Sequence, residues 1–248
     1  MSGHSKWATI KHKKGATDAK RAKVFAKLIR QVEVAAREGG ADPEMNPSLR
    51  TMYQKARDAS VPLDTIDKAI KRATGGLEGV SYEQITYEGY APGGVALLIE
   101  VLTDNRNRSG SDVRGIFNKR GGSLAEPGAV AWQFERKGTL VVDGKADEDD
   151  LMLAAIEAGA EDIAREGDSW RVTTAPGDLH TVRTAIEEAG FAVESGDLTM
   201  VAQNLVELTE TGPAKKILDL IDALEDLDDV QAVFGNFDIT DEVLESLD

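Results

Sequence analysis

Residues 20–40 read KRAKVFAKLIRQVEVAAREGG, and this stretch predicts an amphipathic helix from about residue 18 to residue 38. At 100° per residue its apolar side chains fall in an arc of about 140°. These side chains are Val24, Phe25, Leu28, Ile29, Val32, Ala35 and Ala36. The glycine pair at 39–40 is typical of a helix end. Two shorter helices are expected over residues 48–60 and 63–74, the latter with Pro62 in its first turn, so that the three form a small bundle.

From residue 77 onward the pattern changes to short strands that alternate with helices. EQITYEGY (83–90) and VALLIEVLT (95–103) are expected strands, followed by a helix over 109–120 that Ser109 or Ser111 would cap. AVAWQFER (129–136) and GTLVVDG (138–144) are expected as two further strands. Because the turns between strands are tight, the alternation favours compact α+β units over a long parallel sheet.

The 248-residue chain has a net charge of −15, but its basic residues are concentrated near the start. Residues 1–75 hold 16 Lys and Arg against 8 Asp and Glu, and the remaining residues hold 13 against 36. A basic module on an acidic body favours a polyanion as the partner of the basic part. The chain has no cysteine, which makes the cytoplasm the simplest location. We expect neither a secretory signal nor a membrane-spanning segment.

Basic side chains of the first helix gather on the side opposite its apolar arc, and a basic arm precedes it. A solvated helix face is the alternative, but such a face usually mixes signs, and i,i+4 acidic partners are nearly absent here. We therefore expect contact with a phosphate backbone. Trp7 would either stack on a base or anchor the arm, and no metal ligand is expected. The candidate residues are Lys6, Trp7, Lys11, His12, Lys13, Lys14, Lys20, Arg21, Lys23, Lys27 and Arg30.

A second basic concentration is TDNRNRSGSDVRGIFNKRGG at 103–122. Arg106 and Arg108, in a loop before a helix start, would suit a phosphate, although they could instead pair with the acidic domains themselves. DGKADEDD at 143–150 resembles a calcium loop superficially. It lacks the glycine at the bend and the closing glutamate, so acidic residues in the first turn of a helix explain it more simply.

Several motifs together resemble one known family. GHSKWATIKHKKGATDAKRAKVFAKLIRQV at 3–32, TDNRNRS at 103–109, VALLIE at 95–100 and LIDALEDLDDVQAVFGNFDI at 220–239 are similar to the YebC/PmpR family, whose mitochondrial relatives include the translational activator of cytochrome c oxidase. The resemblance implies an α+β protein with an N-terminal three-helix domain and two small ferredoxin-like domains, one inserted in the other. The implied divisions are 1–76, 77–135 with 205–240, an insertion at 136–204 and an acidic tail at 241–248.

The resemblance implies a cytoplasmic, nucleic-acid-binding regulator of gene expression, and family usage favours a DNA-binding transcriptional regulator. A ribosome-associated translation factor that binds ribosomal RNA stays open, because the Lys-rich stripe suits a backbone and no convincing helix-turn-helix is found. A protein-interaction adaptor is a further alternative, and the acidic α+β domains could dock the ribosome or another protein. Since P-loop, GxGxxG and GxSxG signatures are missing, we expect no enzyme, no cofactor, no small-molecule substrate and no membrane partner.

Overall fold

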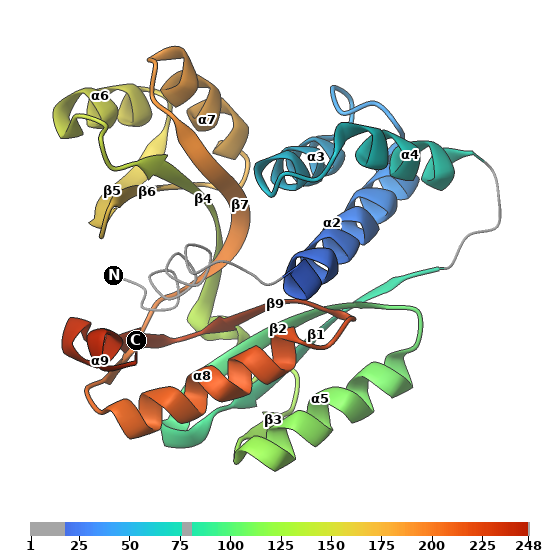
Figure 1. The fold of residues 1–248 in the computed structure, drawn as a ribbon, viewed down its shortest axis with the longest axis vertical. Helices are drawn as coiled ribbons and strands as arrows, with labels where there is room; N and C mark the ends of the chain where they lie inside the picture. The colour runs from blue at the N-terminus through green and yellow to red at the C-terminus, as the bar shows by residue number, and fades with distance from the viewer. Residues whose placement is uncertain (1–17, 76–80, 248) are drawn as a thin grey trace. The chain divides into compact units, whose positions relative to one another are not determined.

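The computed structural model describes residues 18–75 and 81–247 (Figure 1). These residues group into two compact units. Unit 1 holds residues 81–135 and 200–247, and unit 2 holds residues 18–75 and 136–199. We call 18–75 the helical region and 136–199 the inserted segment. Three helices precede mainly antiparallel sheets, so the predicted α+β class is confirmed. The division into three domains stays a prediction.

The helical region consists of α2 (Asp18–Gly39), α3 (Pro47–Asp58) and α4 (Leu63–Thr74). Buried Asn46 ties the end of α2 to the start of α3. Its Oδ1 accepts the N–H of Leu49 at 3.0 Å, which caps α3, while its Nδ2 donates to the carbonyl of Ala35 at 2.8 Å. The helices enclose an aliphatic core of Leu28, Val32, Ala35, Ala36, Leu49, Ala56, Val61, Ile66, Ala69 and Ile70.

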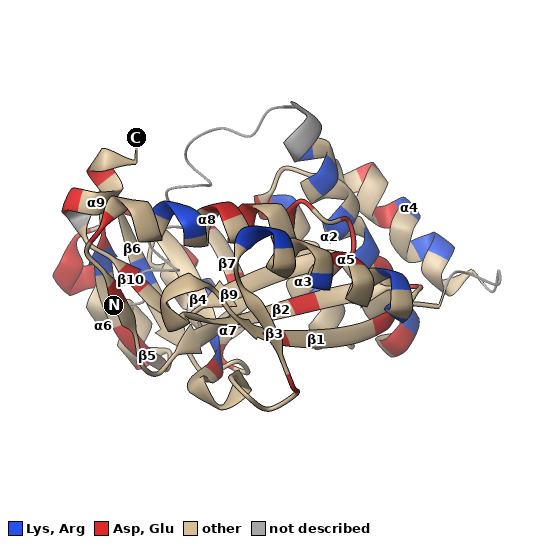
Figure 2. Cartoon of the chain, turned by 90° about the horizontal axis from the view of Figure 1, so that it is seen from below, with Lys and Arg blue, Asp and Glu red and all other residues tan. Residues whose placement is uncertain are grey.

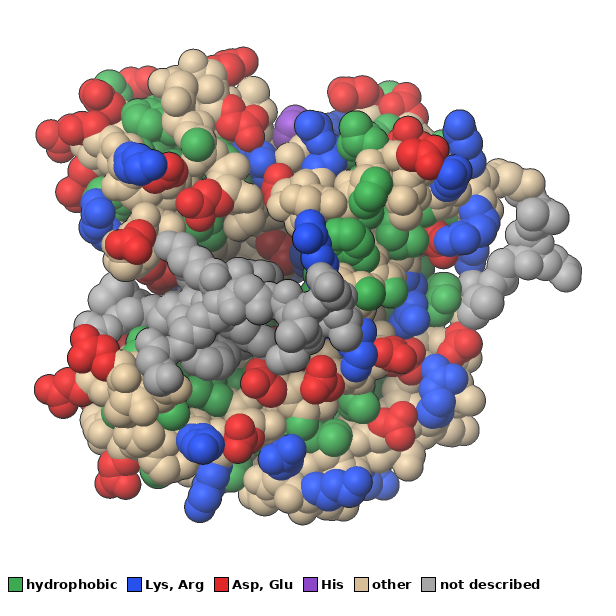
Figure 3. Space-filling view, in the orientation of Figure 1, with side chains coloured by type: hydrophobic (Ala, Val, Ile, Leu, Met, Phe, Trp, Pro, Cys, Tyr) green, Lys and Arg blue, Asp and Glu red, His purple; other side chains and the backbone are tan. Residues whose placement is uncertain are grey.

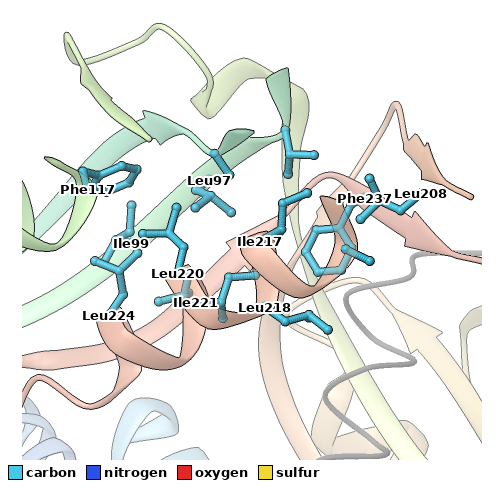
Figure 4. Packing of buried hydrophobic residues seen from close by; sticks show 14 of the residues in the cluster. Leu97, Ile99, Phe117, Leu208, Ile217, Leu218, Leu220, Ile221, Leu224 and Phe237 are labelled. Carbon is cyan, nitrogen blue, oxygen red and sulfur yellow. The ribbon is translucent and has the colours of Figure 1, made fainter. Parts of the chain in front are cut away.

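Unit 1 is built on a four-stranded sheet in the order β3-β1-β2-β9. Its strands are β1 (Glu83–Tyr90), β2 (Ala96–Thr103), β3 (Ser123–Ala125) and β9 (Val230–Gly235). Antiparallel hairpin pairing of β1 and β2 matches Tyr90 with Ala96. Helices α5 (Arg106–Arg120) and α8 (Thr211–Glu225) pack on one face. Figure 4 shows Leu97 and Ile99 of β2 and Phe117 of α5 close to Leu220 and Leu224 of α8 in this core.

The opposite face of this sheet carries a smaller core, which includes Leu98, Phe134 and Phe234. β2 is therefore covered on both sides, which explains its continuous apolar sequence. Residues 131–133 form a short 3-10 turn, and one strand, β4 (Phe134–Asp143), follows where two were expected. The reason is a buried carboxylate: Glu88 accepts the N–H groups of residues 128, 130 and 131, which are thereby removed from any strand ladder.

The inserted segment has the strand and helix order β-α-β-β-α-β, with strands arranged β5-β6-β4-β7. This is the ferredoxin-like arrangement. After β4 come α6 (Glu148–Glu157), β5 (Ala160–Glu166), β6 (Ser169–Thr174), α7 (Leu179–Glu188) and β7 (Val193–Ala202). Because β4 and β7 run through the boundaries of unit 2, these strands carry the chain between the two units.

The remaining elements complete unit 1. β8 (Val206–Leu208) pairs in parallel with β10 (Phe237–Ile239), and α9 (Asp241–Ser246) follows. The expected acidic tail is thus helical over most of its length. Val243 is 4% exposed and belongs to the main core, so this segment contributes to packing.

Candidate nucleic-acid interface

Helix α2 buries most of its predicted apolar arc in the helical region. Four of these side chains are buried, namely Leu28, Val32, Ala35 and Ala36. Val24 departs from the prediction because it is 42% exposed, and Val34, outside the arc, is only 8% exposed. Near the start of the helix, the guanidinium of Arg21 lies 5.4 Å from the ring centroid of Phe25, within the range of a cation–π contact. The apolar face thus fixes how the basic side chains of α2 are presented.

The basic side chains of α2 differ in exposure. Arg21, Lys23 and Arg37 are exposed, whereas Lys27 and Arg30 are half-buried. Lys23, Lys27, Arg30 and Arg37 each make a further interaction within the protein. A phosphate bound at this face would therefore compete with existing contacts, and the net affinity would depend on that exchange.

Much of the predicted arm lies outside the described residues. This applies to Lys6, Trp7, Lys11, His12, Lys13 and Lys14, and also to the side chain of Lys20. Their roles, including the choice between stacking and anchoring for Trp7, stay predictions.

A second basic group, which the sequence analysis did not single out, lies in the middle and last turn of α4. Lys68, Lys71 and Arg72 are exposed and spaced i, i+3 and i+4, so they share one helix face. Arg72 forms an ion pair with Glu33 of α2, and Lys68 pairs with Asp64 at 2.6 Å. Figure 2 shows basic residues on both α2 and α4. In Figure 3, basic side chains gather on the surface over α4. The spacing in KAIKR is the signal that could have found this group.

Helix α5 begins at Arg106, earlier than the sequence suggested, and its N-cap is Asn105. The Oδ1 atom of Asn105 accepts the N–H of Arg108 at 3.1 Å. The prediction that Ser109 or Ser111 caps this helix is therefore wrong, because Asn is among the strongest N-cap residues and starts the helix first. Arg106 and Arg108 thus lie in its first turn and not in a loop before it.

Both arginines pair within unit 1. Nη1 of Arg106 lies 3.0 Å from Oε1 of Glu83, and Nη2 of Arg108 lies 2.7 Å from carboxylate oxygens of both Asp104 and Asp229. Hydrogen bonds to these two carboxylates raise the pKa of Arg108. The internal pairing considered from the sequence is thus present, and contact of either arginine with nucleic acid stays a prediction.

Asp229 joins three elements at the start of α5. Its Oδ2 accepts hydrogen bonds from Oγ of Ser109 at 2.7 Å and Oγ1 of Thr103 at 2.9 Å, in addition to Arg108. Burial alone would raise the pKa of Asp229, but these hydrogen bonds outweigh it and lower the pKa. The TDNRNRS motif therefore holds α5, the end of β2 and the start of β9 together.

The acidic motif at 143–150 forms a helix start. Oδ1 of Asp147 accepts the N–H groups of Asp149 and Asp150 at 3.1 and 3.2 Å, which caps α6. Within residues 18–75 and 81–247, no group of three or more His, Cys, Asp or Glu is placed to hold a metal ion. Over the same ranges, none of the helices combines the length and apolar character needed to cross a membrane.

Comparison with known proteins covers nearly the whole chain. Residues 5–76 match the TACO1/YebC protein N-terminal domain, and residues 82–237 match the TACO1/YebC second and third domain. A relative from Rubrobacter xylanophilus is 58% identical over 98% of each chain. A relative from Halothermothrix orenii is 54% identical over 100% of this chain and 99% of its own. Both relatives are named probable transcriptional regulatory protein.

The fold is similar to a solved structure as well. The crystal structure of a conserved hypothetical protein from Aquifex aeolicus is similar to 92% of this chain and 94% of its own, with a TM-score of 0.83 and 44% sequence identity. The names of the relatives support a YebC-type regulatory role. On these family matches and full-length relatives, the chain belongs to the TACO1/YebC family.

Proposed function

We propose that this protein regulates gene expression by binding the phosphate backbone of nucleic acid through its helical region. The observation that carries the proposal is the division of α2 into a face packed in the helical core and a face with Arg21, Lys23 and Arg37 exposed. A helix anchored by one face needs no further ordering of its backbone when it binds, which lowers the entropic cost of binding. Phosphate contacts of this kind supply affinity with little sequence information.

DNA-binding transcriptional regulation is the first form of the proposal, because the curated relatives bear that name. Association with the ribosome through ribosomal RNA, in support of translation elongation, is the second. It stays open because the sequence shows no convincing helix-turn-helix with polar base-reading side chains.

Triple charge reversal tests the common part of both forms. The variant replaces Lys20, Lys23 and Lys27 by Glu in the full chain, and its binding to a DNA duplex and a ribosomal RNA fragment is measured over a range of salt. If the wild type neutralises four to six phosphates, log K falls with log salt at a slope of about −4 to −5. The reversed chain is expected to lose most of this binding at physiological salt.

A matched control reverses three basic residues elsewhere: Lys145, Lys215 and Lys216, all exposed. This control carries the same net charge as the test variant, so retained binding would show that position matters and not total charge. Sedimentation with ribosomes then separates the two forms, because ribosome association requires co-migration that the triple reversal abolishes. Tight preference for one promoter over scrambled duplex supports transcription. A wild-type chain that binds neither nucleic acid nor ribosomes in dilute buffer refutes the proposal.

The proposal includes no reaction, cofactor, small-molecule substrate or membrane contact, and it places the protein in the cytoplasm. Arg106 and Arg108 would supply a second nucleic-acid contact if their carboxylate partners were exchanged for phosphate. The adaptor alternative instead predicts complexes that resist nuclease and show no steep salt dependence. Purification from nuclease-treated extract therefore distinguishes the two.

A further inference from the structure

The helical region carries a carboxylate beside its basic face, and a neighbouring helix neutralises it. Glu33 follows Arg30 by about one turn of α2, and its side chain is only 14% exposed. Its Oε1 pairs with Nη2 of Arg72 from α4, whose side chain is 65% exposed. The cation is therefore the solvent-facing member of the pair, and it cancels the charge of Glu33 at the surface where a polyanion would approach.

Two further basic residues accompany Arg72 on α4. Lys68 and Lys71 are exposed on the same face. Asp64, one turn before Lys68, pairs with it at 2.6 Å, so a phosphate at Lys68 would have to displace that carboxylate. Basic residues at a helix C-terminus also stabilise the helix dipole. The dipole, however, is satisfied by any cation in the last turn and does not require one that reaches across to α2.

We propose that Lys68 and Lys71 extend the phosphate-binding surface from α2 onto α4, and that Arg72, by pairing with Glu33, removes a charge that would repel the ligand. This inference rests on the proposed function and identifies a further part of the same surface. The ligand is the phosphodiester backbone of RNA or DNA. Because α2 and α4 pack directly against each other, cations on the two helices present a broader surface than a single stripe.

The test uses the full chain and two labelled probes, an RNA hairpin and a DNA duplex of unrelated sequence, with fluorescence anisotropy measured across a salt series. Arg72→Gln leaves Glu33 uncompensated and is expected to weaken binding about three- to tenfold. Glu33→Gln releases Arg72 to a phosphate. It is expected to strengthen binding by a similar factor and to steepen the salt slope by about one.

The double variant, Glu33→Gln with Arg72→Gln, restores the local charge balance. Its affinity is expected to return close to the wild-type value, because the repulsive carboxylate and its compensating cation are lost together. A purely structural pair behaves differently. Either single change would then lower thermal stability, and Glu33→Gln would not bind more tightly than the wild type. The gain in affinity is thus the readout that separates binding from structural support.

Matched controls change the same net charge at exposed positions of the inserted segment, outside α2 and α4. Glu188→Gln removes a carboxylate from the end of α7, and Lys145→Gln removes a cation that is 93% exposed. Since exposed charges beyond a Debye length of about 8 Å are largely screened at physiological salt, both controls should bind within about twofold of the wild type.

The outcomes separate this inference from the proposed function. A response with RNA, DNA or both supports the two-helix surface, and the stronger response identifies the preferred backbone. If the wild type binds with steep salt dependence, but Glu33→Gln shows no gain and Arg72→Gln matches Lys145→Gln, the inference is overturned and the proposed function stands. If the wild type binds neither probe at low salt, the proposed function fails, and this inference fails with it.

Discussion

Asp58 of α3 and Arg183 of α7 form a buried ion pair within unit 2, and its removal should be costly. Their side chains are 10% and 9% exposed. Nη1 and Nη2 of Arg183 donate to the two oxygens of Asp58 at 2.7 and 2.9 Å, and Nε donates to Glu187 at 2.9 Å. Burial alone would lower the pKa of Arg183, but these hydrogen bonds raise it. Arg183 therefore keeps its charge, and the pair joins the helical region to the inserted segment.

The two partners should differ in cost when each is removed. Arg183→Met leaves the buried carboxylate of Asp58 with the amide of Gln54, at 2.9 Å, as a donor. This change is expected to cost about 3–5 kcal/mol. Asp58→Ala should cost less, about 2 kcal/mol, because Glu187 still accepts from Arg183. The double variant removes both charges and should be no less stable than Arg183→Met, which gives a coupling energy of at least about 2 kcal/mol.

Hydrogen exchange by mass spectrometry, applied to the amides of α3 and α7 in the full chain, measures the local opening free energies without assuming all-or-none unfolding. Lys55→Met is the control. It breaks the partly exposed pair of Lys55 with Asp197 and is expected to change stability by about 0–1 kcal/mol. Additive single effects, or losses below about 1 kcal/mol for both Asp58→Ala and Arg183→Met, would contradict the reasoning.

Three further predictions concern single sites and are measured by urea unfolding. Asn105→Ala removes the cap of α5 and should cost about 1 kcal/mol, whereas Ser111→Ala, at an exposed position, should change stability by less than about 0.5 kcal/mol. Glu88→Gln should cost about 1–3 kcal/mol at neutral pH. Burial alone would raise the pKa of Glu88, but hydrogen bonds from three backbone N–H groups lower it. The stability that ionised Glu88 contributes is therefore present above its unfolded pKa and is lost as the pH falls through its folded pKa. Glu88→Gln should accordingly lose less stability in acid than the wild type. Gly115→Ala should stabilise the protein by about 0.5–1 kcal/mol, because an added Cβ at this position inside α5 meets nothing within 4 Å. Gly144→Ala should destabilise it, because the added Cβ would collide with a backbone carbonyl. If Gly144→Ala were the more stable variant, the packing argument would be refuted.

Long periodic segments were predictable because their patterns depend only on local geometry. The arc of α2 anticipated the burial of Leu28 and Val32, and the apolar run at 95–103 predicted the strand that is β2. Segments whose structure depends on distant partners were not predictable. The 3-10 turn at 131–133 is held by Glu88, which lies 43 residues before Ala131. Nothing local in AVAWQFER therefore distinguished this turn from a strand.

The candidate site shows the same limit. The charge excess near the start of the chain could be read from composition, but the pairing of Glu33 with Arg72 required the packing of α2 against α4. Likewise, Asp229 lies far from Arg108 in sequence, and the sequence left open whether the arginines of TDNRNRS pair internally. The early start of α5 could have been predicted from the local sequence, because Asn105 is a preferred N-cap residue.

The interrupted sheet of unit 1 has a consequence for how the protein is made. β2 pairs with β9, and α8 packs in the core beside them. Both β9 and α8 are synthesised only after the whole inserted segment. Until then one edge of β2 and its apolar face lack their native partners, and such a nascent sheet is vulnerable to aggregation. Because β4 and β7 are neighbours, folding of the inserted segment brings the two halves of the interrupted sheet together and so shortens the search for the final strand.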